Sequence, residues 1–356
     1  MANEFDGERL DVIVVGAGQA GLALGYHLRR VGLRFVLLEA GPEVGHSWRS
    51  RWDSLRLFTP AQYANLPGWQ FPAQADIYPG KDQVADYLRD YAQRFALPIQ
   101  LGIEVTGLDA DEPHGFVTRS EQVQFRARQV VLATGPFSIP RIPAIAATLD
   151  ARVTQLHTTA YRSPSQIPQG QVLVVGGGNS GFQIAGELAA AGRDVALAIG
   201  RSNACVPQRI LGRDLFWWQD KVGLLQVTAE SRLGKLMAAN DGTVIGSSRR
   251  GLRDHGVVLR PRVTGVTGRM VTFADGSAID VDVVVWATGF RLDDRWVTIE
   301  NVLDEDGRLR HQRGVTKMPG LYVVGRPWQH TAGSALLGFV QHDAEWLADR
   351  VAGAAT

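Results

Sequence analysis

A glycine-rich turn between an apolar run and a helical pattern occurs twice in the sequence, and it constrains the fold more than any other feature. The first copy is residues 16–21 (GAGQAG), after the apolar run 12–15. The second is residues 176–181 (GGGNSG), after the run 171–175. A helical pattern and another apolar run follow each copy. A strand, a glycine turn, a helix and a strand in this order are typical of a dinucleotide-binding unit.

The glycines of each turn have separate physical roles. Gly16 permits the tight turn, Gly18 lets the backbone approach a pyrophosphate, and Gly21 lets helix and strand pack closely. The N-terminus of the helix then offers free N–H groups and the positive end of its dipole to the phosphates. The same positions recur in the second copy, which therefore predicts a second pyrophosphate site.

The residues after the second strand of each unit differ. Glu39 ends the first unit's strand, where a carboxylate accepts hydrogen bonds from ribose hydroxyls and repels a 2′-phosphate. Arg201 and Ser202 stand at the equivalent place in the second unit, and a guanidinium suits a phosphate. The sequence therefore predicts FAD in the first unit and NADPH in the second, with NADH as a weaker option. The alternative for Arg201 is a solvated surface arginine.

The spacing of the Ala-Thr-Gly segments indicates an internal repeat. Gly16 and Gly135 are 119 residues apart, and Gly176 and Gly289 are 113 residues apart. Residues 319–325 (PGLYVVG) resemble one more strand of the first unit, so the second unit interrupts the first. We expect an α/β fold with two Rossmann-like domains: an NADPH domain, 146–290, inserted into an FAD domain formed by 1–145 and 291–356.

Several further elements follow from local patterns. Residues 41–69 read as a long functional loop, and 213–226 (RDLFWWQDKVGLLQ) as an inserted helical piece packed on the second unit. Alternatives for 213–226 are a roof over the cofactor cleft or a membrane contact. Helices are expected at 81–95, 182–190 and 335–347, and strands at 103–108, 116–119, 122–127 and 129–134. The start of the helix at 335 is expected to face the flavin, because its dipole stabilises an anion.

Charge and cysteine content exclude several classes of protein. The 356 residues carry 37 basic and 36 acidic side chains, which gives no sign of nucleic-acid binding. No apolar run approaches the roughly 18 residues of a membrane span, so a soluble, cytoplasmic protein is expected. Cys205 is the only cysteine, and it cannot form a redox-active pair.

Four motifs together resemble the flavin-containing monooxygenases, and in particular the short bacterial members of the class B flavoprotein monooxygenases. They are the two glycine turns, residues 54–60 (SLRLFTP), residues 78–88 (YPGKDQVADYL) and the two Ala-Thr-Gly segments. The resemblance covers 12–347. Of the family's Phe-x-Gly-x-x-x-His-x-x-x-Tyr fingerprint, His157 and Tyr161 match, whereas Ala151 and Val153 replace the Phe and the Gly. The arginine-centred fingerprint of Baeyer–Villiger enzymes is missing from the sequence, so ketone oxygenation is not expected.

The resemblance implies a monooxygenase that uses FAD, NADPH and O2, forms a C4a-(hydro)peroxyflavin, and oxygenates a sulfide or amine of a small molecule. Phe58 stands near the position where many members place an asparagine, so we expect the oxygenated flavin to be short-lived. An enclosing wall is expected from five aromatic side chains, Trp48, Phe58, Tyr63, Trp69 and Phe71. Core packing is the alternative for each of them.

Two other functions remain open. One is an NADPH-dependent flavoprotein oxidase or quinone reductase that inserts no oxygen, and the other is a non-catalytic flavin redox sensor. No catalytic residue and no metal site is assigned, and a homodimer is one option for the oligomeric state. The predicted cofactor-binding residues are Gly16, Gly18, Gln19, Ala20, Gly21, Glu39, Ala40, Trp48, Arg49, Leu57, Phe58, Val105, Ala133, Thr134, Gly135, Gly176, Gly178, Asn179, Ser180, Gly181, Arg201, Ser202, Thr288, Gly289, Ser334 and Ala335.

Overall fold

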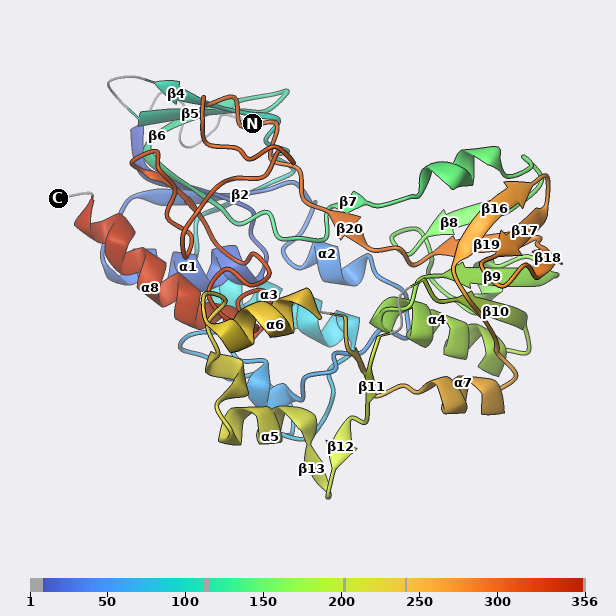
Figure 1. Cartoon of the computed structure of the whole chain (residues 1–356). Coiled ribbons are helices and arrows are strands. Elements are labelled where there is room, and N and C mark those ends of the chain that lie inside the picture. The colour runs from blue at the N-terminus through green and yellow to red at the C-terminus, as the bar shows by residue number, and fades with distance from the viewer. Residues whose placement is uncertain (1–8, 112–114, 201–202, 241, 355–356) are drawn as a thin grey trace.

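The computed structural model describes residues 9–111, 115–200, 203–240 and 242–354, and it contains two separate sheets that lie side by side (Figure 1). Each sheet is the centre of one α/β unit. The chain passes between the units twice, and β7 (Ile139–Pro140) pairs there with β20 (Phe290–Arg291). This short antiparallel pair joins the two crossings.

The first sheet has seven strands in the order β3-β2-β1-β6-β5-β4, with β21 also paired to β6. The pairs among β3, β2, β1, β6 and β21 are parallel, whereas β5 and β4 continue the sheet antiparallel. The strands are β1 (Arg9–Val15), β2 (Phe35–Glu39), β3 (Ile99–Leu101), β4 (Gly107–Asp111), β5 (Gly115–Arg119), β6 (Gln124–Leu132) and β21 (Leu321–Val323).

The second sheet has five parallel strands in the order β15-β10-β9-β19-β8. They are β8 (Thr154–His157), β9 (Gln171–Val175), β10 (Asp194–Ala198), β15 (Val258–Arg260) and β19 (Val283–Trp286). A small antiparallel sheet packs on one face of it through Val271 and Phe273. Its strands are β16 (Val263–Thr267), β17 (Met270–Phe273) and β18 (Ala278–Asp280).

Helices cover the sheets through their apolar faces. In the first unit α1 and α3 pack on one face of the sheet, and α8 packs on α1. In the second unit α4 covers the sheet opposite the small sheet, through Phe182, Ile184 and Leu188. The helices are α1 (Gln19–Arg30), α2 (His46–Arg49), α3 (Lys81–Arg94), α4 (Asn179–Ala190), α5 (Leu215–Lys221), α6 (Arg232–Ala239), α7 (Arg249–Asp254) and α8 (Val340–Gly353).

The predicted fold class is confirmed. Strand β21, from the C-terminal part of the chain, lies beside β6 of the first sheet, so the second unit interrupts the first. The exact domain limits, at 145/146 and 290/291, stay predictions. Helix α3 begins at Lys81 as expected and ends at Arg94.

Four local predictions were wrong. The strand expected at 103–108 lies further along the chain, because β4 begins at Gly107 and ends at Asp111. The separate strands expected at 122–127 and 129–134 form the single strand β6, because β1 pairs with it from Arg126 to Leu132, across the expected break. The helix expected from residue 335 begins at Val340. Turns occupy 335–339 instead, where Gly338 lies so close to Tyr63 that a Cβ would sit 2.0 Å from the Tyr63 carbonyl oxygen. The piece at 213–226 packs on the first unit, as described below.

An insert between β10 and α7, residues 203–247, extends beneath the first unit (Figure 1). It contains α5, α6 and two short strand pairs. The pairs are β11 (Cys205–Val206) with β14 (Val244–Ile245), and β12 (Arg209–Ile210) with β13 (Arg213–Asp214). Among the described residues, no helix combines the length and the apolar character that crossing a membrane requires.

Candidate cofactor and active site

The first glycine turn has the geometry that a pyrophosphate requires. Gly16 has a φ of +110°, and a Cβ on it would lie 2.5 Å from the carbonyl oxygen of Ala133. A Cβ on Gly21 would lie 2.0 Å from the carbonyl oxygen of Gly16. Gly18 is different, because a Cβ there would meet no atom within 4 Å. The open space at Gly18, directly before α1, fits a pyrophosphate at a helix N-terminus.

The second turn repeats this arrangement. Gly176 has a φ of +143°, and a Cβ on it would lie 2.1 Å from the carbonyl oxygen of Ala287. A Cβ on Gly181 would lie 2.0 Å from the Gly176 carbonyl oxygen, whereas one on Gly178 would meet nothing within 4 Å. The same close contacts and the same open position therefore occur in both units.

Glu39 lies at the end of β2 and is held by the glycine turn. Its carboxylate accepts hydrogen bonds from the backbone N–H of Ala17 and of Gly41, each 2.9 Å long. These bonds fix the carboxylate beside the turn, where it can accept further bonds from a ribose. Ala40 follows it on the surface, and Val105 is partly buried and packs against the core cluster that contains Val36 and Leu38 of β2.

Gln19 connects three segments that are far apart in the sequence. Its side chain accepts a hydrogen bond from the Trp48 indole at 3.1 Å and donates one to the carbonyl oxygen of Ala335 at 3.2 Å. The neighbouring Ser334 is fully buried, and its hydroxyl accepts the N–H groups of His330 and Thr331. Four of the predicted residues thus lie around the N-terminus of α1.

The three arginines of the long loop point to different partners. Arg49 binds the carboxylates of Glu43 and Asp86 at 3.1 and 2.8 Å, and these contacts raise its pKa. Arg51 donates to the carbonyl oxygen of Phe137 and lies over the ring of Phe290. Protein groups therefore engage both cations. Arg56 donates to the carbonyl oxygen of Tyr78 at 3.2 Å and lines a pocket.

The Ala-Thr-Gly segment of the first unit contacts a buried ion pair. The carbonyl oxygen of Ala133 lies against Gly16 of the first glycine turn, and Gly135 has a φ of +66°. The Thr134 hydroxyl accepts a 3.3 Å hydrogen bond from Arg326, whose guanidinium binds Asp294 at 2.7 Å. Both charged side chains are buried. The sequence analysis missed this pair, because Arg326 and Asp294 are 32 positions apart and belong to no recognised motif.

Several residues predicted to bind the second cofactor form hydrogen bonds with the insert or with the segments that connect the two units. The Asn179 amide bonds the backbone of Thr243 and Ile245, and Ser180 follows it in α4. The Thr288 hydroxyl donates to the Arg141 carbonyl oxygen. Gly289 accepts a 3.0 Å hydrogen bond from Nε2 of His157, whose pKa is lowered by burial. Arg201 and Ser202 lie outside the described residues.

A pocket of about 340 Å³ lies between the long loop of the first unit, helix α4 and the insert. Leu57 and Phe58 line it, and their predicted contact with a cofactor stays a prediction. Its other lining residues are mostly polar and come from all three segments: Ser54, Arg56, Tyr78, Gln183, Gln208, Ile245, Gly246 and Ser247. The pocket therefore combines polar groups from both units with the ring of Phe58.

Four stacked aromatic side chains stand beside this pocket, and we call Phe58, Tyr63, Phe216 and Phe339 the aromatic wall. Phe216 of α5 is its centre, with ring centroids 5.9 Å from Phe58, 6.3 Å from Tyr63 and 6.1 Å from Phe339. The insert thus roofs the long loop, which corrects the expectation that 213–226 packs on the second unit. Trp69 and Phe71 pack on Tyr87 in the core instead, so they are not part of the wall.

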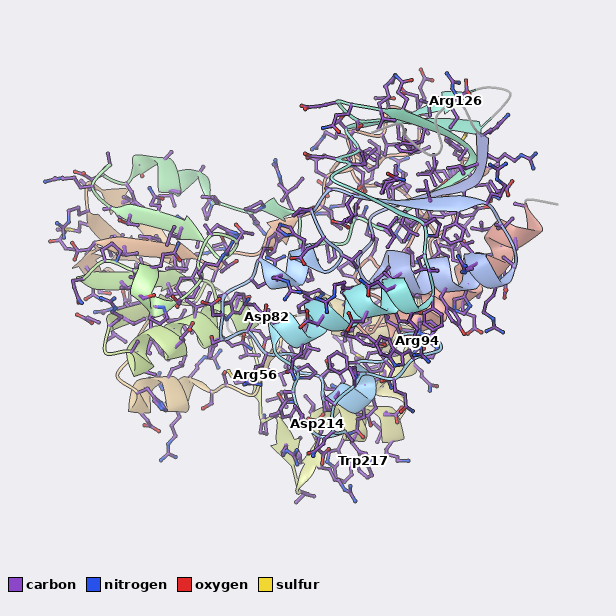
Figure 2. The ribbon with its side chains drawn as sticks, turned by 180° about the vertical axis from the view of Figure 1, so that it is seen from behind. Arg56, Asp82, Arg94, Arg126, Asp214 and Trp217 are labelled. Carbon is purple, nitrogen blue, oxygen red and sulfur yellow. The ribbon has the colours of Figure 1, made fainter. Side chains whose placement is uncertain are left out.

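Asp214 holds the insert against the loop. Its buried carboxylate accepts hydrogen bonds from the Tyr78 hydroxyl at 2.7 Å, from Gln208 at 3.0 Å and from the N–H of Phe216 at 2.7 Å. Figure 2 shows Asp214 and Trp217 on the insert below the long loop. Burial and Asp214 together raise the pKa of Tyr78. No local pattern predicted these partners, because Tyr78 and Asp214 are 136 positions apart.

Comparison with known proteins then identifies the family. The sequence profile of the pyridine nucleotide-disulphide oxidoreductases matches residues 13–209, which is more than half of the chain. The chain belongs to this family. An oxidoreductase of Geobacillus kaustophilus designated CzcO-like is 45% identical to it, over 95% of this chain and 97% of the relative.

Two further proteins connect this member of the family to flavin chemistry. A flavin-containing monooxygenase from Stenotrophomonas maltophilia superposes with a TM-score of 0.77 at 27% identity, covering 97% of this chain and 98% of the other. The probable indole-3-pyruvate monooxygenase YUCCA9 of Arabidopsis thaliana is 26% identical over 91% and 86% of the two chains. This pyridine nucleotide-disulphide oxidoreductase is a flavin-dependent enzyme.

Proposed function

We propose that this enzyme is an NADPH-consuming monooxygenase that transfers one oxygen atom from O2 to the sulfur or nitrogen of a small molecule. The observation that carries the proposal is the aromatic wall beside the pocket. Oxygen transfer needs a site from which water is excluded, because water and proton leakage divert the activated oxygen to peroxide. Of the four rings Phe58 lines the pocket, and the stack behind it through Phe216 would shield that side of the pocket from water.

The residues around the two turns divide the work of holding the cofactors. The open backbone at Gly18 and the N-terminus of α1 would hold the FAD pyrophosphate, and Glu39 the ribose. Gly178 and the N-terminus of α4 would hold the pyrophosphate of NADPH. Bound FAD supplies the redox chemistry, accepting hydride from NADPH and activating O2. Preference for NADPH through Arg201 stays a prediction from the sequence.

The pocket itself would orient the substrate. Arg56 and Gln183 offer hydrogen-bond donors from the loop and α4. The N–H groups of Gln208 bond Phe58 and Asp214, so Gln208 offers its amide oxygen as an acceptor from the insert, and a small polar molecule can be held from three sides. Phe58 offers an apolar ring where many flavin monooxygenases have an asparagine. We infer that part of the NADPH consumed therefore ends as hydrogen peroxide.

Coupling of NADPH consumption to product tests the proposal. The purified enzyme is given NADPH, oxygen and either methyl phenyl sulfide or trimethylamine, and NADPH, peroxide and the S-oxide or N-oxide are measured together. Formation of the oxide supports the proposal. Peroxide equal to the NADPH consumed, with no oxide from any sulfide or amine tried, would identify an oxidase, and rapid reduction of an added quinone would identify a quinone reductase. Absence of turnover would favour a redox sensor.

A further inference from the structure

The end of the insert exposes apolar and basic side chains together. Leu211 is 87% exposed and Val222 is 65% exposed, and Ile210 is also exposed. Arg213 and Lys221 are exposed beside them, and both lie over the ring of Trp217, at 5.3 and 5.9 Å. We call these six residues the insert tip. They lie in the β12–β13 hairpin, in α5 or, for Val222, directly after α5, and this hairpin and helix form the lower edge of the molecule in Figure 1.

The hairpin turn carries a backbone conformation that its sequence does not favour. Leu211 and Gly212 connect β12 to β13, with φ values of +49° and +76°. Two positive φ values are typical of a tight hairpin turn whose first position prefers asparagine, aspartate or glycine. A leucine at positive φ is an outlier. Strain at an exposed apolar residue points to a function outside the folding of the chain.

The hairpin and helix form one unit rather than a loose loop. The Trp218 indole donates a 2.9 Å hydrogen bond to the carbonyl oxygen of Ile210, and Asp214 caps α5 through the N–H of Phe216. Phe216 anchors the helix in the aromatic wall. These contacts therefore hold Leu211 in a fixed position at the end of the hairpin.

The side chains of the insert tip indicate what kind of partner this surface binds. An element that lies in the interface of an anionic membrane typically exposes apolar and aromatic side chains together with cations. The insert tip has this combination of side chains. The acids of this stretch, Asp214 and Asp220, do not cancel this character, because Asp214 is buried and Asp220 is one carboxylate beside exposed cations. We propose that the insert tip binds the surface of a bilayer that contains anionic lipid, with Leu211 entering the interface.

The pocket lies at the base of the same hairpin. Gln208 lines it directly before β12, and Tyr78, another pocket residue, bonds Asp214 at the end of β13. A membrane bound at the insert tip would therefore place the pocket close to lipid. This surface does not depend on the reaction, so it can be tested apart from the monooxygenase proposal.

Sedimentation with vesicles tests the proposal on the whole, FAD-containing enzyme. Vesicles of phosphatidylglycerol mixed with phosphatidylcholine are compared with vesicles of phosphatidylcholine alone, over a series of salt concentrations. We expect binding to the anionic vesicles only, weakened by salt. Leu211→Asn should reduce the partition coefficient about tenfold, since a leucine side chain leaves the interface. Asparagine tolerates positive φ, so this variant relieves the turn and keeps the fold.

Charge variants and a control complete the experiment. Arg213→Gln and Lys221→Gln should each weaken binding about fivefold at low salt. Met270→Gln replaces an apolar residue that is 48% exposed on the small sheet of the second unit, and it should change nothing. Binding by Leu211→Asn equal to that of the unchanged enzyme, or no binding to anionic vesicles at low salt, overturns the proposal. So does a concentration-dependent dimer that Leu211→Asn dissociates, because the insert tip would then be a self-association surface.

Discussion

Gly18 and Gly21 lie three positions apart, yet the structure has space for a side chain at Gly18 and none at Gly21. A side chain on Gly18 meets no protein atom, whereas one on Gly21 meets the carbonyl oxygen of Gly16 at 2.0 Å. The first glycine therefore serves the ligand and the second serves the packing of α1 on β1. Variants at the two positions should separate these roles, although both change a glycine of the same motif.

We expect Gly18→Val to fold and to lose its FAD, because the new side chain takes the space of the pyrophosphate. The matched variant Gly178→Val should keep its FAD and lose reduction by NADPH, since the same open position occurs in the second unit. Flavin released by heating and identified by chromatography measures the first effect. Anaerobic bleaching of the flavin by NADPH measures the second. Full FAD content in Gly18→Val would contradict the assignment of the first turn.

Gly21→Ala should destabilise the protein instead. One methyl group would have to displace the Gly16 carbonyl or shift α1, and overpacking of this kind costs roughly 1–3 kcal/mol. The free energy of unfolding, from denaturation in urea followed by circular dichroism, checks this. A variant as stable as the unchanged protein would show that α1 can move away from the turn.

At the scale of elements, α5 is the part of the insert that packs on the rings of the first unit. Phe216 is the one residue of α5 in the aromatic wall, and its ring contacts the rings of all three other wall residues. Phe216→Leu keeps an apolar side chain of similar size but breaks the stack. We expect FAD content to stay unchanged and the ratio of peroxide released to NADPH consumed to rise several-fold, because water reaches the pocket. Trp217→Leu, at the neighbouring surface position, serves as the control in solution.

The sequence predicted those parts of the site that depend on local pattern. The two glycine turns, Glu39 and the helix from Lys81 follow from spacing and periodicity, and they lie where the pattern puts them. The partners of Phe216 and Asp214 could not be predicted, because they depend on how the insert folds back over a loop about 140 positions earlier. The role of Arg49 in cofactor binding stays a prediction. The ion pairs that its guanidinium makes with Glu43 and Asp86 could not be predicted from the sequence.

At the scale of the whole molecule, histidines link the fold to pH. Burial lowers the pKa of His27 in α1, of His157 at the crossing between units and of His311 near Arg326 and Asp294. His157 donates to Gly289 through Nε2 and accepts the N–H of Thr159 at Nδ1, which requires a neutral ring. Each of these side chains is therefore neutral in the folded protein at a pH where the unfolded chain binds a proton.

Acidification should consequently destabilise the molecule below pH 6.5, the ordinary value for histidine. Between the lowered pKa of the folded state and 6.5, the unfolded state binds more protons than the folded state. The free energy of unfolding therefore rises with pH in that window and levels off above it. Each pKa unit of lowering is worth about 1.4 kcal/mol. Urea denaturation at pH 7.5, 6.5 and 5.5 should show the larger part of the loss in the last interval, because at pH 6.5 only about half of the histidines of the unfolded chain carry a proton. His157→Gln should reduce this loss, because glutamine can bond Gly289 without titrating. An equal loss in the variant would assign the effect to His27 and His311.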